Sequence, residues 1–278
     1  MKNKQNITTL IVILVVLEDY LVQKGNAMPL NGLTVPEIDL KYSELAERFN
    51  RREKFYKTYL QRHSGSHGFL VEVDGRYLIR EALVNDASIK DLHVLRQSIS
   101  EILVEQTAIY QDLFSQLEEK LIENDPDESR DFILSLFNEK RFRNYGQIFE
   151  VLSYSILKVY FESFGFSLKR FSLSFANDGG MDFISSNGVY QVTSIPTNQK
   201  IQSDLDKLPG IQRVMVLSNC PSPIRELCLN SGIVTEIITT DDLTSHFLSW
   251  LYEKDIHYPM HMKFLLTTIR DEMKRETA

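Results

Sequence analysis

The feature that most constrains the fold is a regular alternation of helical and strand patterns in the C-terminal half of the chain. The predicted elements are, in order, helix 145–164, strands 167–175, 180–185 and 189–194, helix 198–208, strand 213–218, helix 223–230, strand 233–239 and helix 241–252. Strand 213–218 is apolar throughout, which is typical of a buried parallel strand. This order predicts an α/β domain whose mixed sheet is flanked by helices, followed by one more helix at 257–278.

The N-terminal part has a different pattern, in which helices precede a hairpin. A helix is expected over Thr8–Gln23, a short second helix near Ile38, and a third helix capped by Ser43. Asp74-Gly75 then separates two alternating segments and is a strong signal for a two-residue hairpin turn.

The apolar run Leu10–Leu17 resembles the start of a signal peptide, but it is too short to span a bilayer, which takes about 20 apolar residues. Glu18 and Asp19 follow it directly, so we expect a buried first helix and no membrane segment. The only two cysteines, Cys220 and Cys228, form no CxxC motif and indicate reduced thiols in a cytoplasmic protein.

The segment between these two parts is helical by period. Its apolar residues recur at helical spacing: Leu92, Leu95, Ile99, Leu103, Leu113, Leu117 and Leu121. Such a helix packs on its own domain or on its twin in a dimer. The chain is therefore divided into an N-terminal domain at 1–82, a helical linker or dimerisation segment at 83–130, and an α/β domain at 131–278.

Basic residues gather on the predicted third helix, within Lys41–His63. They are Arg48, Arg51, Arg52, Lys54, Lys57 and Arg62, interleaved with aromatic side chains. Since the formal net charge is -7, any DNA contact has to come from such a local patch. Glu44, Glu47 and Glu53 partly offset the charge, so a solvated charged face is the alternative interpretation.

The N-terminal part resembles the winged-helix family over Thr8–Ile79. The resemblance is carried by the apolar first helix, the turn Leu33-Thr34-Val35-Pro36-Glu37-Ile38, the helix end Tyr59-Leu60-Gln61-Arg62-His63, and the wing Asp74-Gly75-Arg76-Tyr77. The resemblance implies that the basic third helix enters the major groove of DNA and that Arg76 touches the backbone or the minor groove.

Three short segments carry the candidate chemistry: Gly146-Gln147-Ile148-Phe149-Glu150, Asn177-Asp178-Gly179-Gly180-Met181-Asp182-Phe183 and Gly188-Val189-Tyr190-Gln191-Val192-Thr193. Hydrolysis of a phosphodiester with Mg²⁺ needs oxygen ligands that converge on the metal. Asp182 begins one strand and Gln191 lies on the next, so a tight turn lets them face one point. Glu150 belongs to the helix expected beside these strands and completes the set of metal ligands, while Asp178 is a turn acid or a further ligand.

This order of segments resembles the PD-(D/E)xK nuclease superfamily over Tyr145–Ser218, and especially the Mrr-type restriction endonucleases, which also join a winged helix to the nuclease domain. The resemblance implies a restriction-endonuclease-like core. Glu150, Asp182 and Gln191 then hold Mg²⁺, and Glu150, Asp182, Gln191, Thr193 and Lys200 form the catalytic set. It also implies double-stranded DNA as substrate and a homodimer, because cutting both strands needs two sites.

Thr193 departs from the family, which has lysine at that position. Threonine brings no positive charge to a water molecule. Three explanations are open. Lys200 on the next helix or Lys169 on the preceding strand takes the place of the missing lysine, or the metal alone activates the water, or the site is inactive. The sequence thus predicts a type II-like restriction endonuclease. A non-catalytic DNA-binding protein with a degenerate nuclease fold and a structure-specific or transposon nuclease remain the alternatives.

Overall fold

The computed structural model describes residues 7–49, 55, 57–64, 68–80, 88–138, 146–170, 181–186, 188–207, 209–253 and 258–277, without the side chains of 7, 58, 59, 62, 276 and 277. The chain divides into two compact units, one formed by residues 1–113 with 277–278 and the other by residues 114–276. The division falls inside helix α4 (Ile89–Glu123), which the sequence assigned to a linker.

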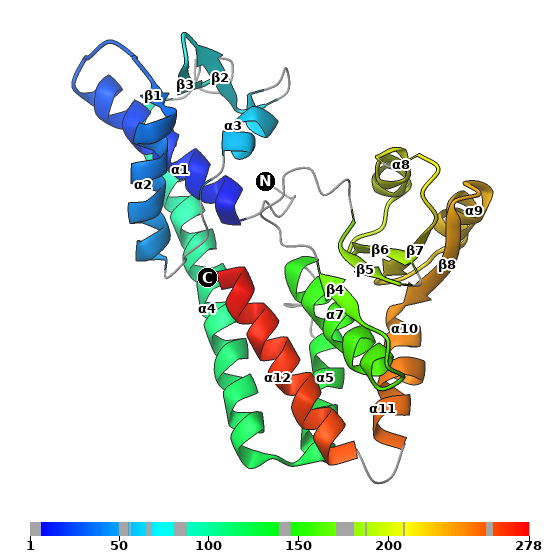
Figure 1. Cartoon of the computed structure of the whole chain (residues 1–278). Coiled ribbons are helices and arrows are strands. Elements are labelled where there is room, and N and C mark those ends of the chain that lie inside the picture. The colour runs from blue at the N-terminus through cyan, green and yellow to red at the C-terminus, as the bar shows by residue number, and fades with distance from the viewer. Residues whose placement is uncertain are drawn as a thin grey trace. The chain divides into compact units, whose positions relative to one another are not determined.

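The first unit combines helices with a small antiparallel sheet (Figure 1). Its elements are α1 (Ile7–Gly25), β1 (Leu33–Thr34), α2 (Val35–Arg48), α3 (Lys57–His63), β2 (Leu70–Val73), β3 (Arg76–Ile79) and the first part of α4. The sheet order is β1-β3-β2. Asp74 and Gly75 both have positive φ, 50° and 75°, which a tight two-residue turn requires, so the predicted hairpin is confirmed.

Helix α1 supplies the core of this unit. Leu10, Leu14 and Leu17 are almost completely buried, as expected for a buried first helix. The start of α2 is fixed by Glu37, whose carboxylate accepts 2.7 Å hydrogen bonds from both the amide and the hydroxyl of Thr34. These bonds hold the pKa of Glu37 below its usual value.

The predicted third helix starts at the wrong residue. Ser43 is an interior residue of α2, and its hydroxyl donates 2.9 Å to the carbonyl of Asp39 one turn earlier instead of capping a helix. Helix α3 begins only at Lys57, so Arg48 ends α2 and does not belong to the third helix.

The apolar stripe of α4 is mostly used within the chain. Leu92, Ile99, Leu103, Leu113 and Leu117 are all buried in this single chain. These five side chains pack within the chain, as the first of the two expected arrangements requires, and a dimer contact by this segment stays a prediction.

The second unit contains a five-stranded mixed sheet. Its elements are the end of α4, α5 (Pro126–Asn138), α7 (Gly146–Glu162), β4 (Leu168–Arg170), β5 (Phe183–Ser185), β6 (Gly188–Thr193), α8 (Asn198–Asp206), β7 (Arg213–Leu217), α9 (Ser222–Asn230), β8 (Val234–Thr239), α10 (Thr240–Asp242), the π-helical η2 (Leu243–Leu248), α11 (Ser249–Glu253) and α12 (Tyr258–Thr277). The strand order is β4-β5-β6-β7-β8, antiparallel up to β6 and parallel beyond it. The predicted α/β class and mixed sheet are confirmed.

The two faces of this sheet carry different helices (Figure 1). On one face, α7 places Tyr154 against Phe183 and Phe161 against Tyr190, with ring centroids 5.1 and 6.1 Å apart. On the other face, α8 and α9 form an apolar cluster with β7, composed of Ile201, Leu205, Met215, Leu217, Ile224 and Cys228. Because successive side chains of a strand point to opposite faces, residues along each strand alternately contact α7 and the α8–α9 pair.

Among the helices in the described part of the chain, none combines the length and the apolar character needed to cross a membrane.

Candidate functional site

Asp182 lies beside β6, at the start of β5. Its amide donates 2.9 Å to the carbonyl of Tyr190, and its carboxylate accepts a 2.6 Å hydrogen bond from the amide of Val192. The β5–β6 hairpin thus brings the aspartate of the second sequence motif directly against the third motif. The Asp182 side chain is partly exposed, so a ligand can approach it.

Glu150 is paired with an arginine that the sequence analysis did not single out. Nε and Nη2 of Arg170 donate 2.9 and 2.7 Å hydrogen bonds to the same oxygen, Oε1, of Glu150. The two side chains are only 4% and 12% exposed for Arg170 and Glu150 respectively. Arg170 therefore neutralises this candidate metal ligand in a largely dry environment.

Arg170 also reaches the C-terminal helix. Its Nη1 donates 3.3 Å to Oε2 of Glu272 on α12, and Oε1 of Glu272 accepts 2.8 Å from Arg275. Glu150, Arg170, Glu272 and Arg275 thus form a ladder of alternating charges that connects α7, β4 and α12. Breaking a buried pair in such a ladder costs about 3–5 kcal/mol, because it leaves a charge without its partner.

Gln191 and Thr193 lie on the other face of the sheet. In the parallel pairing of β6 and β7, Gln191 is opposite Met215 and Thr193 is opposite Leu217, which belong to the cluster under α8 and α9. Glu150 and Arg170 lie on the α7 face, since Arg170 pairs with Phe183 in register. The structure therefore places Glu150 and Gln191 on opposite faces of the sheet.

Gln191 faces a buried arginine. Nη1 of Arg213 lies 3.5 Å from Oε1 of Gln191 and donates 2.8 Å to the carbonyl of Asp204. Burial lowers the pKa of Arg213, although the nearby charge of Asp204 opposes this effect. Both side chains are buried, so Gln191 is held as a partner of Arg213 as the chain is folded here.

Thr193 is connected to Lys200 through Asp204. The Thr193 hydroxyl donates 3.3 Å to Oδ2 of Asp204, while Oδ1 of Asp204 accepts 2.6 Å from Lys200 and 2.8 Å from Lys207. Lys200 thus lies close to Thr193, as the sequence suggested, but the buried carboxylate of Asp204 lies between them. Lys169, the other candidate lysine, is exposed on β4.

The start of α7 lies against the end of β6. A Cβ atom added at Gly146 would lie 3.1 Å from the hydroxyl oxygen of Ser194, so the glycine allows this close approach. The first and third sequence motifs therefore meet at their ends, even though Glu150 itself points toward Arg170.

The fit of these residues to Mg²⁺ is uneven. Carboxylate and amide oxygens are the correct ligand type. Asp182 fits best because it is partly exposed, whereas Glu150 has to give up hydrogen bonds from Arg170 before it can bind a metal. Within the described ranges, no three His, Cys, Asp or Glu side chains are gathered in a way that could hold a metal ion. Asp178 lies outside these ranges.

The candidate DNA-binding residues are described only in part. Arg48 at the end of α2 and Lys57 at the start of α3 are exposed. Arg76 is partly exposed and engaged within its own unit, because its Nη1 donates 3.0 Å to the carbonyl of Gly32 and lies 3.7 Å from Glu37. Arg51, Arg52, Lys54 and the side chain of Arg62 lie outside the described part.

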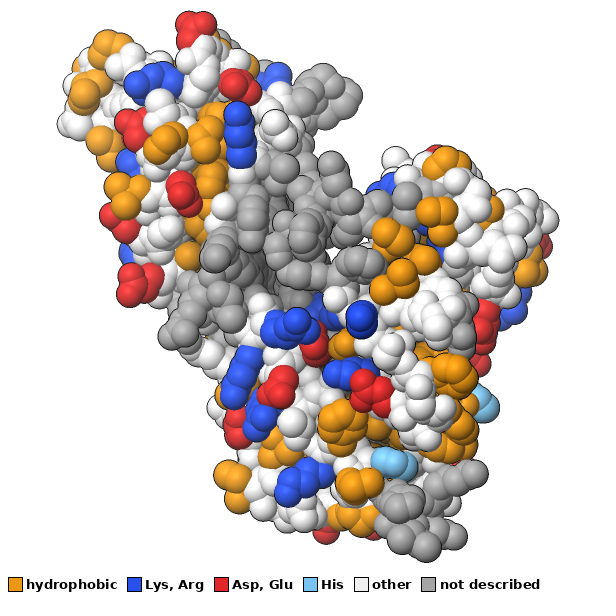
Figure 2. Space-filling view, in the orientation of Figure 1, with side chains coloured by type: hydrophobic (Ala, Val, Ile, Leu, Met, Phe, Trp, Pro, Cys, Tyr) orange, Lys and Arg blue, Asp and Glu red, His pale blue; other side chains and the backbone are white. Residues whose placement is uncertain are grey.

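Charges of both signs are mixed on the visible face of the second unit. Figure 2 shows basic and acidic side chains next to one another over its helices. On α12, for example, Arg270 and Lys274 lie within 4 Å of Glu118, at 3.9 and 3.8 Å. Any DNA contact on this unit therefore depends on local groups of cations.

Comparisons with protein-family models, with curated proteins and with solved structures each found no significant match.

Sequence reasoning missed Arg170, Arg213 and Asp204. Two of them carry a visible signal: Arg213 begins the otherwise apolar strand Arg-Val-Met-Val-Leu, and Asp204 shares the buried face of α8 with Ile201 and Leu205. A charge at a position with core periodicity indicates a buried ionic partner. Arg170 carries no comparable signal, since its partners lie 20 and 102 residues away.

Proposed function

We propose that this chain is a metal-dependent DNA endonuclease of the restriction-enzyme kind. The observation that carries the proposal is the hydrogen bond between Asp182 and the Val192 amide, which fixes a partly exposed carboxylate beside Gln191 and Thr193. The combination of a helix glutamate, an aspartate after two glycines and a glutamine on the next strand is what resembles the PD-(D/E)xK nucleases.

The element order of the second unit supports the same proposal. Helix α7 precedes the antiparallel strands β4, β5 and β6, and α8 connects β6 to the parallel strand β7. A restriction-endonuclease-like core is expected to have this arrangement, with the candidate residues at the β5–β6 hairpin.

The first unit supports a DNA-binding role. Its order of one helix, a short strand, two helices and a hairpin is that of a winged helix. In our proposal, α3 approaches the major groove, and Arg48 and Lys57 contact phosphates because both are exposed. Arg76 supports the wing through Gly32 and Glu37.

In the proposed reaction, Mg²⁺ held by Asp182 would supply an activated water and stabilise charge on the phosphate. Asp182 is oriented by the Val192 amide, and Gln191 would add a second oxygen ligand only if its side chain left Arg213. Glu150 is held by Arg170 on the face of the sheet opposite Gln191, so it would not share a metal with Gln191 in this arrangement. Two copies of the chain are proposed to cut the two strands, since each copy carries one candidate site.

A second candidate function is DNA binding without cleavage. Two contacts favour it: Arg170 neutralises Glu150, and Thr193, which stands at the family's lysine position, is engaged by the buried Asp204. A nuclease fold with these contacts could keep its DNA affinity while lacking the groups that cut.

Digestion of DNA by the purified chain tests the proposal. Genomic and phage DNA, methylated and unmethylated, and a branched DNA would be incubated with Mg²⁺ and, separately, with a chelator. Discrete fragments that require Mg²⁺ support the endonuclease, and preferential cutting of the branched DNA indicates a structure-specific enzyme. Binding without cutting on every substrate would identify the non-catalytic alternative.

A further inference from the structure

We propose that Lys200 and Lys207 form a phosphate-binding site on α8 that holds the sugar-phosphate backbone of DNA, with the buried Asp204 fixing both ammonium groups. Nζ of Lys200 and Nζ of Lys207 lie 2.6 and 2.8 Å from one oxygen of Asp204. The DNA partner rests on the proposed function. The site itself rests on the contacts of α8.

The burial of Asp204 makes this pair of lysines unusual. The Asp204 side chain is 0% exposed, whereas Lys200 and Lys207 are 47% and 41% exposed. One ammonium would neutralise the Asp204 carboxylate, so these three side chains together carry one net positive charge that faces solvent; the Asp206 carboxylate lies on the other side of α8, bonded to Gln202. The buried Arg213, which donates to the Asp204 carbonyl, adds another positive charge beneath the helix.

The ammonium groups keep hydrogen-bonding capacity for a ligand. Each ammonium has three N–H donors. The bond to Asp204 uses one donor of each lysine and holds both lysine side chains in one geometry. Part of the entropy cost of ordering these side chains is therefore met before a phosphate binds. Two cations set around one point favour an anion with several oxygens, as a phosphodiester has.

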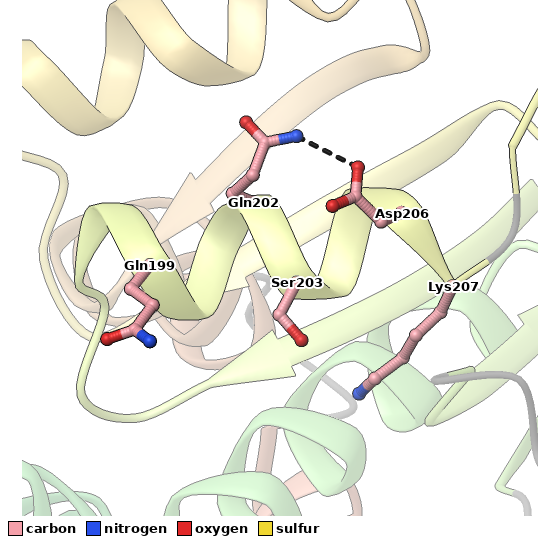
Figure 3. Close-up of a pocket in the computed structure, with 5 residues that line it drawn as sticks. All are labelled: Gln199, Gln202, Ser203, Asp206 and Lys207. Carbon is pink, nitrogen blue, oxygen red and sulfur yellow. Dashed lines mark hydrogen bonds between the residues drawn. The ribbon is translucent and has the colours of Figure 1, made fainter.

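Further polar side chains extend the site along α8. Gln199, Ser203 and Lys207 lie along one side of the helix in Figure 3 and line an open recess of about 480 Å³. Asp206 also lines it but lies on the other side of the helix, where Gln202 donates a 2.9 Å hydrogen bond to its carboxylate. The side of the recess formed by Gln199, Ser203 and Lys207 therefore offers an amide, a hydroxyl and an ammonium to a nucleic-acid backbone.

The position of the site relates it to the candidate centre. Asp204 accepts a hydrogen bond from Thr193 on β6, so Asp204 alone connects the two lysines to the third sequence motif. A phosphate held here belongs to DNA that runs along the solvent side of α8. Lys200 in this role grips the substrate and does not activate water.

Salt-dependent DNA binding by the full chain tests the site. A labelled duplex would be titrated with protein in the presence of chelator, and the dissociation constant measured across a range of salt concentrations. Removing both lysines risks leaving Asp204 buried without a counter-ion, so the comparison is made in an Asp204→Asn background, with and without Lys200→Gln and Lys207→Gln. A control carries Lys90→Gln and Lys263→Gln, which remove the same charge from exposed positions on α4 and α12.

We expect the logarithmic salt slope of the triple variant to be shallower than that of Asp204→Asn by about 0.9 for each lysine that contacts phosphate. The control should keep the wild-type slope. Equal slopes for the triple variant and Asp204→Asn, with DNA still bound, would overturn the phosphate site and leave the endonuclease proposal standing. A shallower slope in a chain that never cuts DNA would keep the site and overturn the nuclease. Absence of DNA binding by the wild-type chain would overturn both.

Discussion

Arg170 donates two hydrogen bonds, at 2.9 and 2.7 Å, to a single carboxylate oxygen of Glu150. This pairing decides how the glutamate of the first motif can act. Because both side chains are largely buried, neither charge can be left alone without a large cost. Glu150 is therefore a structural anchor between α7 and β4 in the chain as it stands, and becomes a metal ligand only if the guanidinium moves.

The first prediction concerns this pairing. Arg170→Met should lower the free energy of unfolding by about 3–5 kcal/mol, because Glu150 and Glu272 lose their shared partner inside the protein. Urea unfolding followed by circular dichroism measures the change. Arg270→Met, which removes more exposed pairs with Asp271 and Glu118, should change stability by about 0–1 kcal/mol. Equal effects of the two substitutions would show that the Arg170 ladder does not stabilise the fold.

The second prediction concerns two glycines of the first unit, both with positive φ. A Cβ atom at Gly32 would lie 2.7 Å from Cγ of Leu78 and 2.8 Å from the carbonyl oxygen of Tyr77, whereas a Cβ atom at Gly75 would meet nothing within 4 Å. Gly75→Ala should cost about 1–2 kcal/mol for the backbone conformation alone. Gly32→Ala should cost roughly 1–3 kcal/mol more, because Leu78 and the β3 backbone have to shift. Thermal unfolding of the two variants compares them directly, and a Gly75 variant less stable than the Gly32 variant would contradict the packing described for β1 and β3.

The third prediction concerns alkaline pH. Burial raises the pKa of Cys228 to about 11 from a usual value of 9.0. The folded chain thus favours the neutral thiol, so this contribution to stability is complete below pH 9 and is lost as the pH rises from 9 toward 11. Cys228 alone should lower the free energy of unfolding by up to about 1.4 kcal/mol for each pH unit in this window.

Cys228→Ala isolates this contribution from the other groups that titrate at high pH. The variant should lose less stability than the wild-type chain between pH 9 and 11, whatever its stability at neutral pH. Identical losses in the two chains would show that the Cys228 thiol ionises equally well in the folded and unfolded states.

The fourth prediction concerns the missing lysine. Thr193→Lys places an ammonium beside Asp204, which already binds Lys200 and Lys207, at the position where the nuclease family has lysine. If the proposed function is correct, the variant should cut DNA about tenfold faster or more, since a positioned group of this kind contributes at least that much. Thr193→Met adds a long side chain without charge and is the matched control. A folded Thr193→Lys variant that cuts no faster than Thr193→Met would show that position 193 does not act on the attacking water.

The sequence predicted those elements that depend on neighbouring residues. The hairpin at Asp74-Gly75 follows from the positive φ angles that this dipeptide accepts, and β7 follows from its apolar run. The helix expected to start at Ser43 was placed wrongly because serine bonds either forward as a cap or back to a carbonyl one turn earlier, and here Ser43 bonds back to Asp39. A local pattern cannot distinguish these two arrangements.

The candidate site was predicted less completely because its contacts are not local. The closeness of Asp182 to β6 follows from a short hairpin and was expected. The pairing of Glu150 with Arg170 and of Gln191 with Arg213 joins residues that are 20 and 22 positions apart on different elements. Only the three-dimensional packing shows that arginines oppose both of these candidate ligands.

Cleavage of DNA by the wild-type chain and by Asp182→Asn, under the same Mg²⁺ concentration, tests the central claim most directly. Asparagine keeps an oxygen that can accept the hydrogen bond of Val192 but removes the charge that a metal needs. We expect the wild-type chain to cut and Asp182→Asn to cut about a thousandfold more slowly with unchanged DNA affinity, since a bound metal stabilises the transition state by several kcal/mol. Asp241→Asn, at an exposed carboxylate on α10, should cut at the wild-type rate. Equal cleavage rates for the wild-type chain and Asp182→Asn, or no cleavage by a wild-type chain that binds DNA, would contradict the proposal.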